Sequence, residues 1–445
     1  MLTISLIVLS ILFIVISTTR YNVHPFLALL VAAFFFGLFS GMPLEDIIST
    51  INAGFGGTLE SIGLIIIIGV IIGTFLENSG GAYALANAVL KIFGKKSVHS
   101  VMAVIGYIVS VPVFADSGFI ILSSLNRALS KRAKVSLAGT AVVLALGLTA
   151  THTMVPPTPG PIAAAGIIGA DLGIVILIGL YTSICALIIC IIFAKKYAGK
   201  IYIDPAPELS DKEVAEKLKT APSAVKSFLP IIIPIILIVF RSVAEYPTNP
   251  FGSGQLKVFI SFIGNPVTAL FIGMLLSFLL PEKLDKKMMG TAGWVGKAMQ
   301  NGAIIILITG AGGAFGRVLQ SSEIGVILGD AVLDSNLGIW LPFLVAAGIK
   351  SAQGSSTVAL ITAASLIVPL IPSMGMESEI SKAMVVIAIG AGSTVVSHAN
   401  DSFFWVVTRM SDMNVKQGYQ LHTLGTGILG FSAMLFLSIL NIFIN

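Results

Sequence analysis

The chain alternates between long apolar runs and short polar or charged segments. Ten of the runs have about the 20 residues that an α-helix needs to cross the ~30 Å hydrocarbon core of a bilayer. They cover about 2–19, 25–42, 58–77, 136–156, 163–194, 228–244, 258–280, 298–317, 383–408 and 420–443. Transmembrane β-strands would be about 10 residues long and would alternate in polarity. The pattern therefore predicts an all-α polytopic membrane protein.

Two further apolar stretches, about 98–128 and 338–372, are interrupted near their middle by Pro, Gly or polar residues. A helical arm of roughly 11 residues reaches only ~17 Å, which is too short to cross a bilayer. We therefore predict two re-entrant hairpins whose tips lie near the midplane, where protein or a water-filled cavity must surround them. The segments at about 136–161 and 383–408 are interrupted too, and they predict broken helices.

One long hydrophilic segment, 197–226, divides the chain into two similar halves, 1–196 and 227–445. Residues 58–73 resemble residues 298–313, and a hairpin and a broken span follow in both halves. Each half has five spans and one hairpin, and an odd number of spans turns the second half upside down. Inverted repeats with discontinuous helices are typical of secondary transporters. We expect the hydrophilic segment to be a cytoplasmic linker.

Composition agrees with a membrane location, because 56% of the 445 residues are hydrophobic and 11% are charged. A soluble domain has roughly 25% charged residues. With the N-terminus outside, most basic residues fall in inner loops and the outer loops carry acids. This is the positive-inside pattern, so the net charge of +5 reflects topology and does not indicate nucleic-acid binding. The sequence predicts a bacterial inner-membrane protein with both termini outside.

No signature of an enzyme or a metal site is present. Cys185 and Cys190 lie in one apolar span without other ligands nearby in the sequence. HExxH, Walker A and nucleophile-elbow motifs are missing from the sequence. We therefore expect no catalytic activity, no metal and no cofactor.

The interruptions of the first half carry titratable and hydroxyl side chains. They are Asp116 and Ser117 at the hairpin tip, and Thr151, His152, Thr153 and Thr158 beside the proline-rich break. A carboxylate inside a membrane is costly and usually functional, so Asp116 is the first candidate for a proton carrier. The alternatives are that Asp116 only caps a helix and that His152 is only a packing residue.

The interruptions of the second half are polar as well. They are Lys350, Ser351, Gln353, Gly354, Ser355 and Ser356 at the hairpin tip, and Ser397, His398, Asn400 and Asp401 at the break. A cation beside a helix N-terminus favours an anion. His398 and Asp401 form a second candidate for proton coupling. The alternatives are that Lys350 extends to the outer interface and that the cluster at the break only caps a helix.

These four interruptions are the polar sequence expected at membrane depth, so we predict that they converge on one site. The substrate carboxylate is expected near Lys350 and Ser355. The hydroxyl groups of the substrate are expected to form hydrogen bonds with side chains of the two helix breaks and the second hairpin: Thr151, His152, Gln353, Ser397 and Asn400. The substrate class predicted by this pocket is a small anionic hydroxy acid.

Several motifs extend over nearly the whole chain: HPFLALL (24–30), GFGGTLESIG (54–63), THTMVPPTPGP (151–161), AQGSSTVAL (352–360) and SHANDSFFWV (397–406). With these motifs the chain resembles the gluconate permease (GntP-type) family of the ion-transporter superfamily. The resemblance implies proton symport of gluconate or a related sugar acid, with an elevator-like movement of a transport domain against a scaffold domain. A homo-oligomer, if it forms, is expected to associate through the scaffold helices.

The resemblance leaves the substrate open. Many members of the family carry other residues at the positions of Asp116, Thr158 and Lys350, all of which belong to the predicted site. A shorter acid such as glycerate or a tetronate, or D-serine, which one branch of the family carries, remains an alternative. An anion channel is the alternative from a different functional class.

Overall fold

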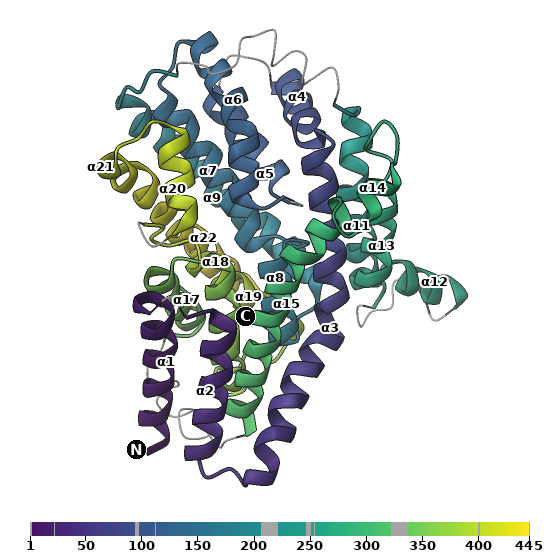
Figure 1. Ribbon diagram of the computed structural model, residues 1–445, viewed down its shortest axis with the longest axis vertical. Coiled ribbons are helices and arrows are strands. Elements are labelled where there is room, and N and C mark those ends of the chain that lie inside the picture. The colour runs from purple at the N-terminus through teal and green to yellow at the C-terminus, as the bar shows by residue number, and fades with distance from the viewer. Residues whose placement is uncertain are drawn as a thin grey trace.

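A computed structural model describes residues 2–21, 23–93, 98–111, 113–205, 221–245, 251–252, 254–321, 337–398 and 401–444. Over these ranges the chain is helical and contains no strand. The helices pack into one elongated body with the long helix α3 along one side (Figure 1). The all-α class predicted from the apolar runs is confirmed.

The first half comprises nine α-helices and one 3-10 helix among its described residues. They are α1 (Leu2–Arg20), α2 (Pro25–Phe39), α3 (Leu44–Asn78), α4 (Gly81–Phe93), α5 (Val98–Val109), α6 (Ala115–Ala133), α7 (Leu137–Met154), α8 (Pro159–Ile168), α9 (Leu172–Lys196) and η1 (Ala198–Lys200). Helices α5 and α6 form the two arms at the first predicted hairpin, and α7 and α8 lie on either side of the first predicted break.

The described part of the second half comprises eleven α-helices, one 3-10 helix and one π-helix. It contains α11 (Ala224–Ala244), α12 (Gln255–Ile263), α13 (Pro266–Ser277), α14 (Lys286–Met289), α15 (Trp294–Ser321), α17 (Trp340–Gln353), α18 (Ser356–Ile367), η2 (Val368–Leu370), α19 (Glu379–Gly392), α20 (Ser402–Met410), α21 (Val415–Gly418), the π-helix η3 (Tyr419–Thr423) and α22 (Leu424–Ile444). Helices α17 and α18 occupy the second predicted hairpin, and α19 and α20 the second predicted break. The inverted relation of the halves stays a prediction.

Six helical stretches in the described ranges are long and apolar enough to cross a membrane, and the bent pair α12–α13 makes a seventh. The apolar pattern predicted one continuous span where α12 and α13 meet at an angle of 59°. The bend follows from Asn265 and Pro266. The Asn265 side chain accepts from Val267 N at 3.0 Å, and Pro266, which has no amide proton to donate, begins the new helix.

Helix α3 begins at Leu44, well before the predicted start near residue 58. Glu45 and Asp46 lie in its first turn, where acidic side chains favour a helix N-terminus. Ile47 and Ile51 are buried, so the added turns also present an apolar face to the rest of the protein. The extension was missed because its polar residues interrupt the apolar run.

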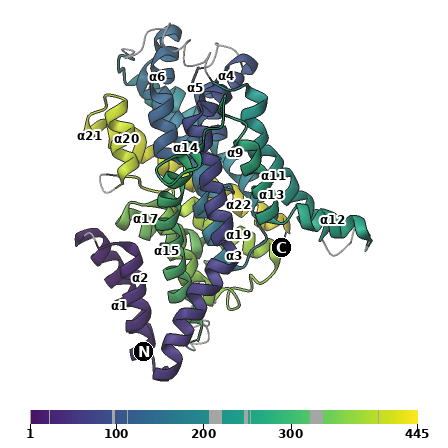
Figure 2. The same ribbon diagram turned by 45° about the vertical axis from the view of Figure 1, so that its right-hand side comes forward.

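Helices α3 and α15 cross at very close range and lie side by side in both views (Figures 1 and 2). The approach depends on glycine. A Cβ atom on Gly54 would lie 2.6 Å from the Gly313 carbonyl oxygen, and one on Gly313 would lie 1.9 Å from Thr58 Oγ1. Small residues at such crossings let helix backbones approach within a membrane.

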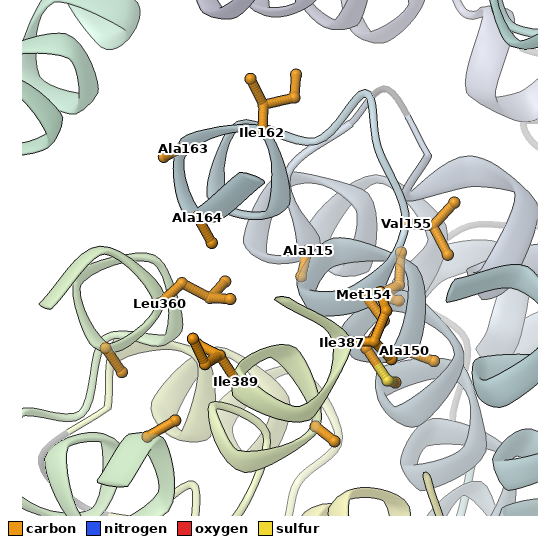
Figure 3. Close-up of a cluster of buried hydrophobic side chains, with 14 of the residues drawn as sticks. Ala115, Ala150, Met154, Val155, Ile162, Ala163, Ala164, Leu360, Ile387 and Ile389 are labelled. Atoms are coloured by element: carbon orange, nitrogen blue, oxygen red, sulfur yellow. The ribbon is translucent and has the colours of Figure 1, made fainter. Parts of the chain in front are cut away.

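Apolar side chains from interrupted elements of both halves lie in one buried cluster (Figure 3). The labelled residues of this cluster are Ala115, Ala150, Met154, Val155, Ile162, Ala163, Ala164, Leu360, Ile387 and Ile389. They belong to α6, α7, α8, α18 and α19 and to the connection that follows α7. This packing holds the ends of the hairpins and broken helices beside one another.

Candidate functional site

A cavity of about 280 Å³ lies where the two hairpin tips meet the two helix breaks. Its lining residues are Phe114, Ala115, Asp116, Thr149, His152, Lys350, Gln353, Ser355, Ser356, Thr357, Thr394, Ser397, Asp401, Ser402, Phe403 and Thr426. Residues from positions 114 to 426 of the chain therefore share one pocket, as the convergence of the four interruptions predicts.

Three helices begin at this cavity: α6, α18 and α20. Ser355 caps α18 by accepting from Val358 N at 3.3 Å, and Asp401 caps α20 by accepting from Phe403 N at 3.0 Å. A helix N-terminus carries the equivalent of roughly half a positive charge. The backbone at these three helix N-termini thus contributes positive potential to the cavity.

The cavity wall contains a buried ion pair between the second hairpin and the second break. Lys350 Nζ lies 2.6 Å from Asp401 Oδ2, and Lys350 is 1% exposed. Lys350 also donates to the Gly354 carbonyl, and Asp401 Oδ2 accepts from the Ser397 hydroxyl. Buried charges need such additional partners to offset the cost of leaving water. Lys350 therefore does not extend to the outer interface.

Three cavity side chains have buried polar atoms without a hydrogen-bond partner in the described part of the chain. These atoms are Asp116 Oδ1, His152 Nδ1, and both Nε2 and Oε1 of Gln353. Buried polar atoms are paired in the large majority of cases, with protein or with ordered water. Their concentration around one cavity indicates that a ligand or water molecules provide the missing partners.

Other predicted residues of the first half are close to this cavity but do not line it. The hydroxyls of Thr151, Thr153 and Thr158 donate to backbone carbonyls: Tyr107 at 2.9 Å, Thr149 at 2.9 Å and Val155 at 2.7 Å, respectively. The Ser117 side chain interacts with Glu77 of α3. These four side chains satisfy protein groups, so the structure does not bring them to the pocket with Asp116 and His152.

The remaining predicted residues of the second half support the wall of the cavity. His398 Nε2 lies 2.8 Å from the Ser351 carbonyl, so the His398 side chain joins the break to the hairpin, and the His398 carbonyl accepts from Asp401 N at 2.8 Å. Gly354 contributes the carbonyl that accepts from Lys350. Asn400 lies outside the described residues.

The sequence profile of the GntP family permeases matches residues 2–443. The chain belongs to this permease family. The gluconate permease of Pseudomonas aeruginosa is 34% identical over 431 residues, which cover 95% of this chain and 94% of the relative. The D-serine transporter DsdX of Escherichia coli K12 is 33% identical over 440 residues, 97% of this chain and 96% of the relative. The chain is therefore a membrane transporter by family.

A solved structure, the crystal structure of the Alcanivorax borkumensis YdaH transporter, shares the fold of this GntP family permease. The TM-score is 0.64 at 13% sequence identity, and the match covers 95% of this chain and 99% of the other. At this identity the likeness concerns the fold alone. It agrees with the polytopic architecture predicted from the apolar runs.

Eight residues that line the cavity of this GntP family permease were not predicted from the sequence. They are Phe114, Ala115, Thr149, Thr357, Thr394, Ser402, Phe403 and Thr426. Thr149 lies three residues before His152 on α7, and residues at this spacing share one face of a helix, so the spacing was a usable signal for Thr149. Thr394 and Ser397 follow the end of α19 at Gly392, so no helical spacing relates them. Thr426, whose Oγ1 accepts from Ser397 N at 3.2 Å, reaches the site from a different helix, and nothing local in its sequence indicates this.

Proposed function

We propose that this chain takes up gluconate or a related small hydroxy acid together with a proton. The observation that carries the proposal is the cavity itself, with unpaired polar atoms on Asp116, His152 and Gln353 and with three helix N-termini around it. Its volume of about 280 Å³ is near the lower end of ligand pockets, which measure roughly 300–1,000 Å³. Membership of a transporter family supports transport of the ligand.

The substrate carboxylate binds at the N-terminus of α18, beside Ser355, Ser356 and Lys350. Helix N-termini favour anions through unpaired amide groups, and Lys350, which is paired with Asp401 in the structure, provides the cation. The hydroxyl groups of the substrate bind to Gln353 and His152, whose unpaired atoms include hydrogen-bond donors and acceptors. A sugar acid presents a carboxylate and several hydroxyl groups in one small molecule and matches this lining.

Asp116 carries the proton. Its Oδ1 has no partner in the described part of the chain, whereas both oxygens of Asp401 are hydrogen-bonded and one of them is paired with Lys350. A potential that is negative inside opposes an incoming anion by about 2.3 kcal/mol per charge per 100 mV. One proton bound with the substrate cancels this charge and adds the driving force of the pH gradient. Asp401 is the second candidate.

The two halves act as inverted repeats, with residues 1–196 and 227–445 on either side of a cytoplasmic linker. The repeated order of hairpin and broken helix in both halves supports this arrangement. The long pair α3 and α15 forms part of the scaffold, and the hairpins and broken helices around the cavity form the moving transport domain. The scaffold is also where a homo-oligomer would form.

The experiment is uptake into proteoliposomes with gluconate, glycerate, threonate and D-serine as substrates. Asp116→Asn is expected to abolish accumulation driven by a pH gradient while retaining counterflow, which needs no net proton movement. Asp46→Asn is the matched control, because Asp46 is exposed in the first turn of α3 and lies outside the cavity. If Asp116→Asn and Asp401→Asn both keep gradient-driven accumulation, the proton assignment is wrong.

D-serine is the second candidate substrate, because an unpaired carboxylate at Asp116 could accept from an ammonium group. The D-serine transporter relative supports including it in the panel. An anion channel would give a flux without saturation and without coupling. Saturable, gradient-driven accumulation of any member of the panel would exclude it.

A further inference from the structure

A fully buried histidine, His422, lies directly behind the Lys350–Asp401 ion pair. It belongs to the π-helix η3, is 0% exposed and does not line the cavity. Its Nε2 lies 3.1 Å from Ser397 Oγ, and its ring packs edge-on against Phe403 at a centroid distance of 5.5 Å. Its Nδ1 is buried without a partner among the described residues, so its one described polar contact is Ser397.

The π-helix and the start of α22 hold Ser397 from three sides. Thr423 Oγ1 donates to the Ser397 carbonyl, Ser397 N donates to Thr426 Oγ1 at 3.2 Å, and His422 contacts the Ser397 hydroxyl. A π-helix is rare and is often found at functional sites. Here its wider turn places His422 and Thr423, which are adjacent in sequence, against one residue of the α19–α20 break.

The hydrogen-bond directions follow from the single proton of the Ser397 hydroxyl. Ser397 Oγ donates that proton to Asp401 Oδ2 and can therefore only accept from His422. His422 accordingly has its proton on Nε2 and donates. The donors form an ordered row from His422 through Ser397 to Asp401, and Lys350 approaches the same carboxylate oxygen from the cavity side.

We propose that His422 is a positioning residue that allows Lys350 to leave Asp401 and bind the substrate carboxylate. The proposal rests on the proposed function of the cavity. When Lys350 turns to the substrate, Asp401 loses one donor and keeps Ser397 on Oδ2 and Phe403 N on Oδ1. A donor from His422 polarises the Ser397 hydroxyl and strengthens its bond to the carboxylate. Asp401 then remains in place although its cation has moved.

The test compares His422→Phe, which fills the site without a donor, with His422→Gln, which keeps a donor in reach of Ser397. The readout is counterflow of gluconate, with D-serine in a parallel series, because counterflow requires no ion gradient. His422→Phe is expected to raise the half-saturation concentration by ten-fold or more and to change the maximal rate much less. His422→Gln is expected to recover most of the affinity. Tyr419→Phe, in the same π-helix, should behave as wild type.

A double-mutant cycle with Ser397→Ala tests whether His422 acts through Ser397. Strong non-additivity is expected, since the two residues belong to one row of donors. Equal affinities of His422→Phe, His422→Gln and wild type would overturn the proposal. Equal losses of affinity in the two variants would overturn it as well, because a hydrogen-bond donor at position 422 would then have no role. Wild-type counterflow without any gradient-driven accumulation would instead overturn proton symport and leave the His422 comparison valid.

Discussion

Gln353 ends helix α17 at the cavity with both amide atoms buried and unpaired in the described part of the chain. A side chain in this state contributes little to folding, because a buried polar group without a partner is costly. Its neighbour in the wall, Lys350, is in the opposite condition, with a carboxylate and a carbonyl as partners. Gln353 can therefore bind a ligand without losing a protein contact, whereas Lys350 must give up protein partners to do so.

Gln353→Ala is expected to raise the half-saturation concentration for uptake by about ten-fold or more, since a substrate hydroxyl loses its partner and one hydrogen bond in a buried site is worth about 1–3 kcal/mol. The melting temperature in detergent is expected to stay the same or rise, since no protein contact of the amide is lost. Uptake kinetics and thermal unfolding of the same preparations provide the measurement.

The matched control for Gln353→Ala is Thr151→Val, which removes a bond of 2.9 Å to the Tyr107 carbonyl and does not line the cavity. It is expected to lose roughly 1 kcal/mol of stability and to keep the wild-type affinity. A large loss of affinity in Thr151→Val with none in Gln353→Ala would contradict this division of roles.

At the scale of elements, the α3–α15 crossing depends on the lack of a side chain at particular positions. A Cβ atom on Gly54 would lie 2.6 Å from a backbone oxygen and 2.7 Å from Arg317 Cβ, whereas one on Gly57 would meet nothing within 4 Å. Gly54→Ala is therefore expected to cost about 1–3 kcal/mol by overpacking. Gly57→Ala is expected to be neutral or slightly stabilising, since alanine favours the helix.

Thermal unfolding in detergent, with the remaining monodisperse fraction as the readout, distinguishes these two glycine variants. Equal melting temperatures for Gly54→Ala and Gly57→Ala would show that the two helices can move apart at little cost. In that case the close crossing would not stabilise the scaffold.

Much of the element order was predictable, because a break in an apolar run is a strong signal when polar residues are costly in a membrane. Both hairpin tips and both broken helices coincide with such breaks. The contacts that complete the site were not predictable in the same way. Thr426 and His422 lie at the start of an otherwise apolar run, where the first turn of α22 and the π-helix direct them towards Ser397. The bend before Pro266 was not predicted, because apolar residues on both sides of it continue the apolar run.

At the scale of the whole molecule, the distribution of charges predicts the orientation in the membrane. Glu377, just before α19, and Lys287, in the short helix α14, are both exposed. The segment with Glu377 is predicted to lie outside and the segment with Lys287 inside. In a chain with Cys185→Ala and Cys190→Ala, Glu377→Cys is expected to react with an impermeant maleimide in intact cells. Lys287→Cys is expected to react only after the membrane is permeabilised.

The reverse labelling pattern would contradict the positive-inside assignment and place both termini in the cytoplasm. Labelling of both cysteines in intact cells would indicate leaky cells, so a cytoplasmic marker protein is labelled in parallel. The experiment is independent of the substrate and tests topology alone.

Helix α3, with its 35 residues, is longer than a bilayer is thick. At 1.5 Å per residue the helix measures about 52 Å, and even a tilt of 40°, at the upper end of the usual range, leaves about 40 Å along the bilayer normal. A hydrocarbon core of ~30 Å cannot contain the whole helix. Its acidic first turn therefore extends beyond the lipid as a rigid helical segment. An antibody fragment directed at Glu45 and Asp46 would add a rigid extramembrane mass and leave the transport elements untouched.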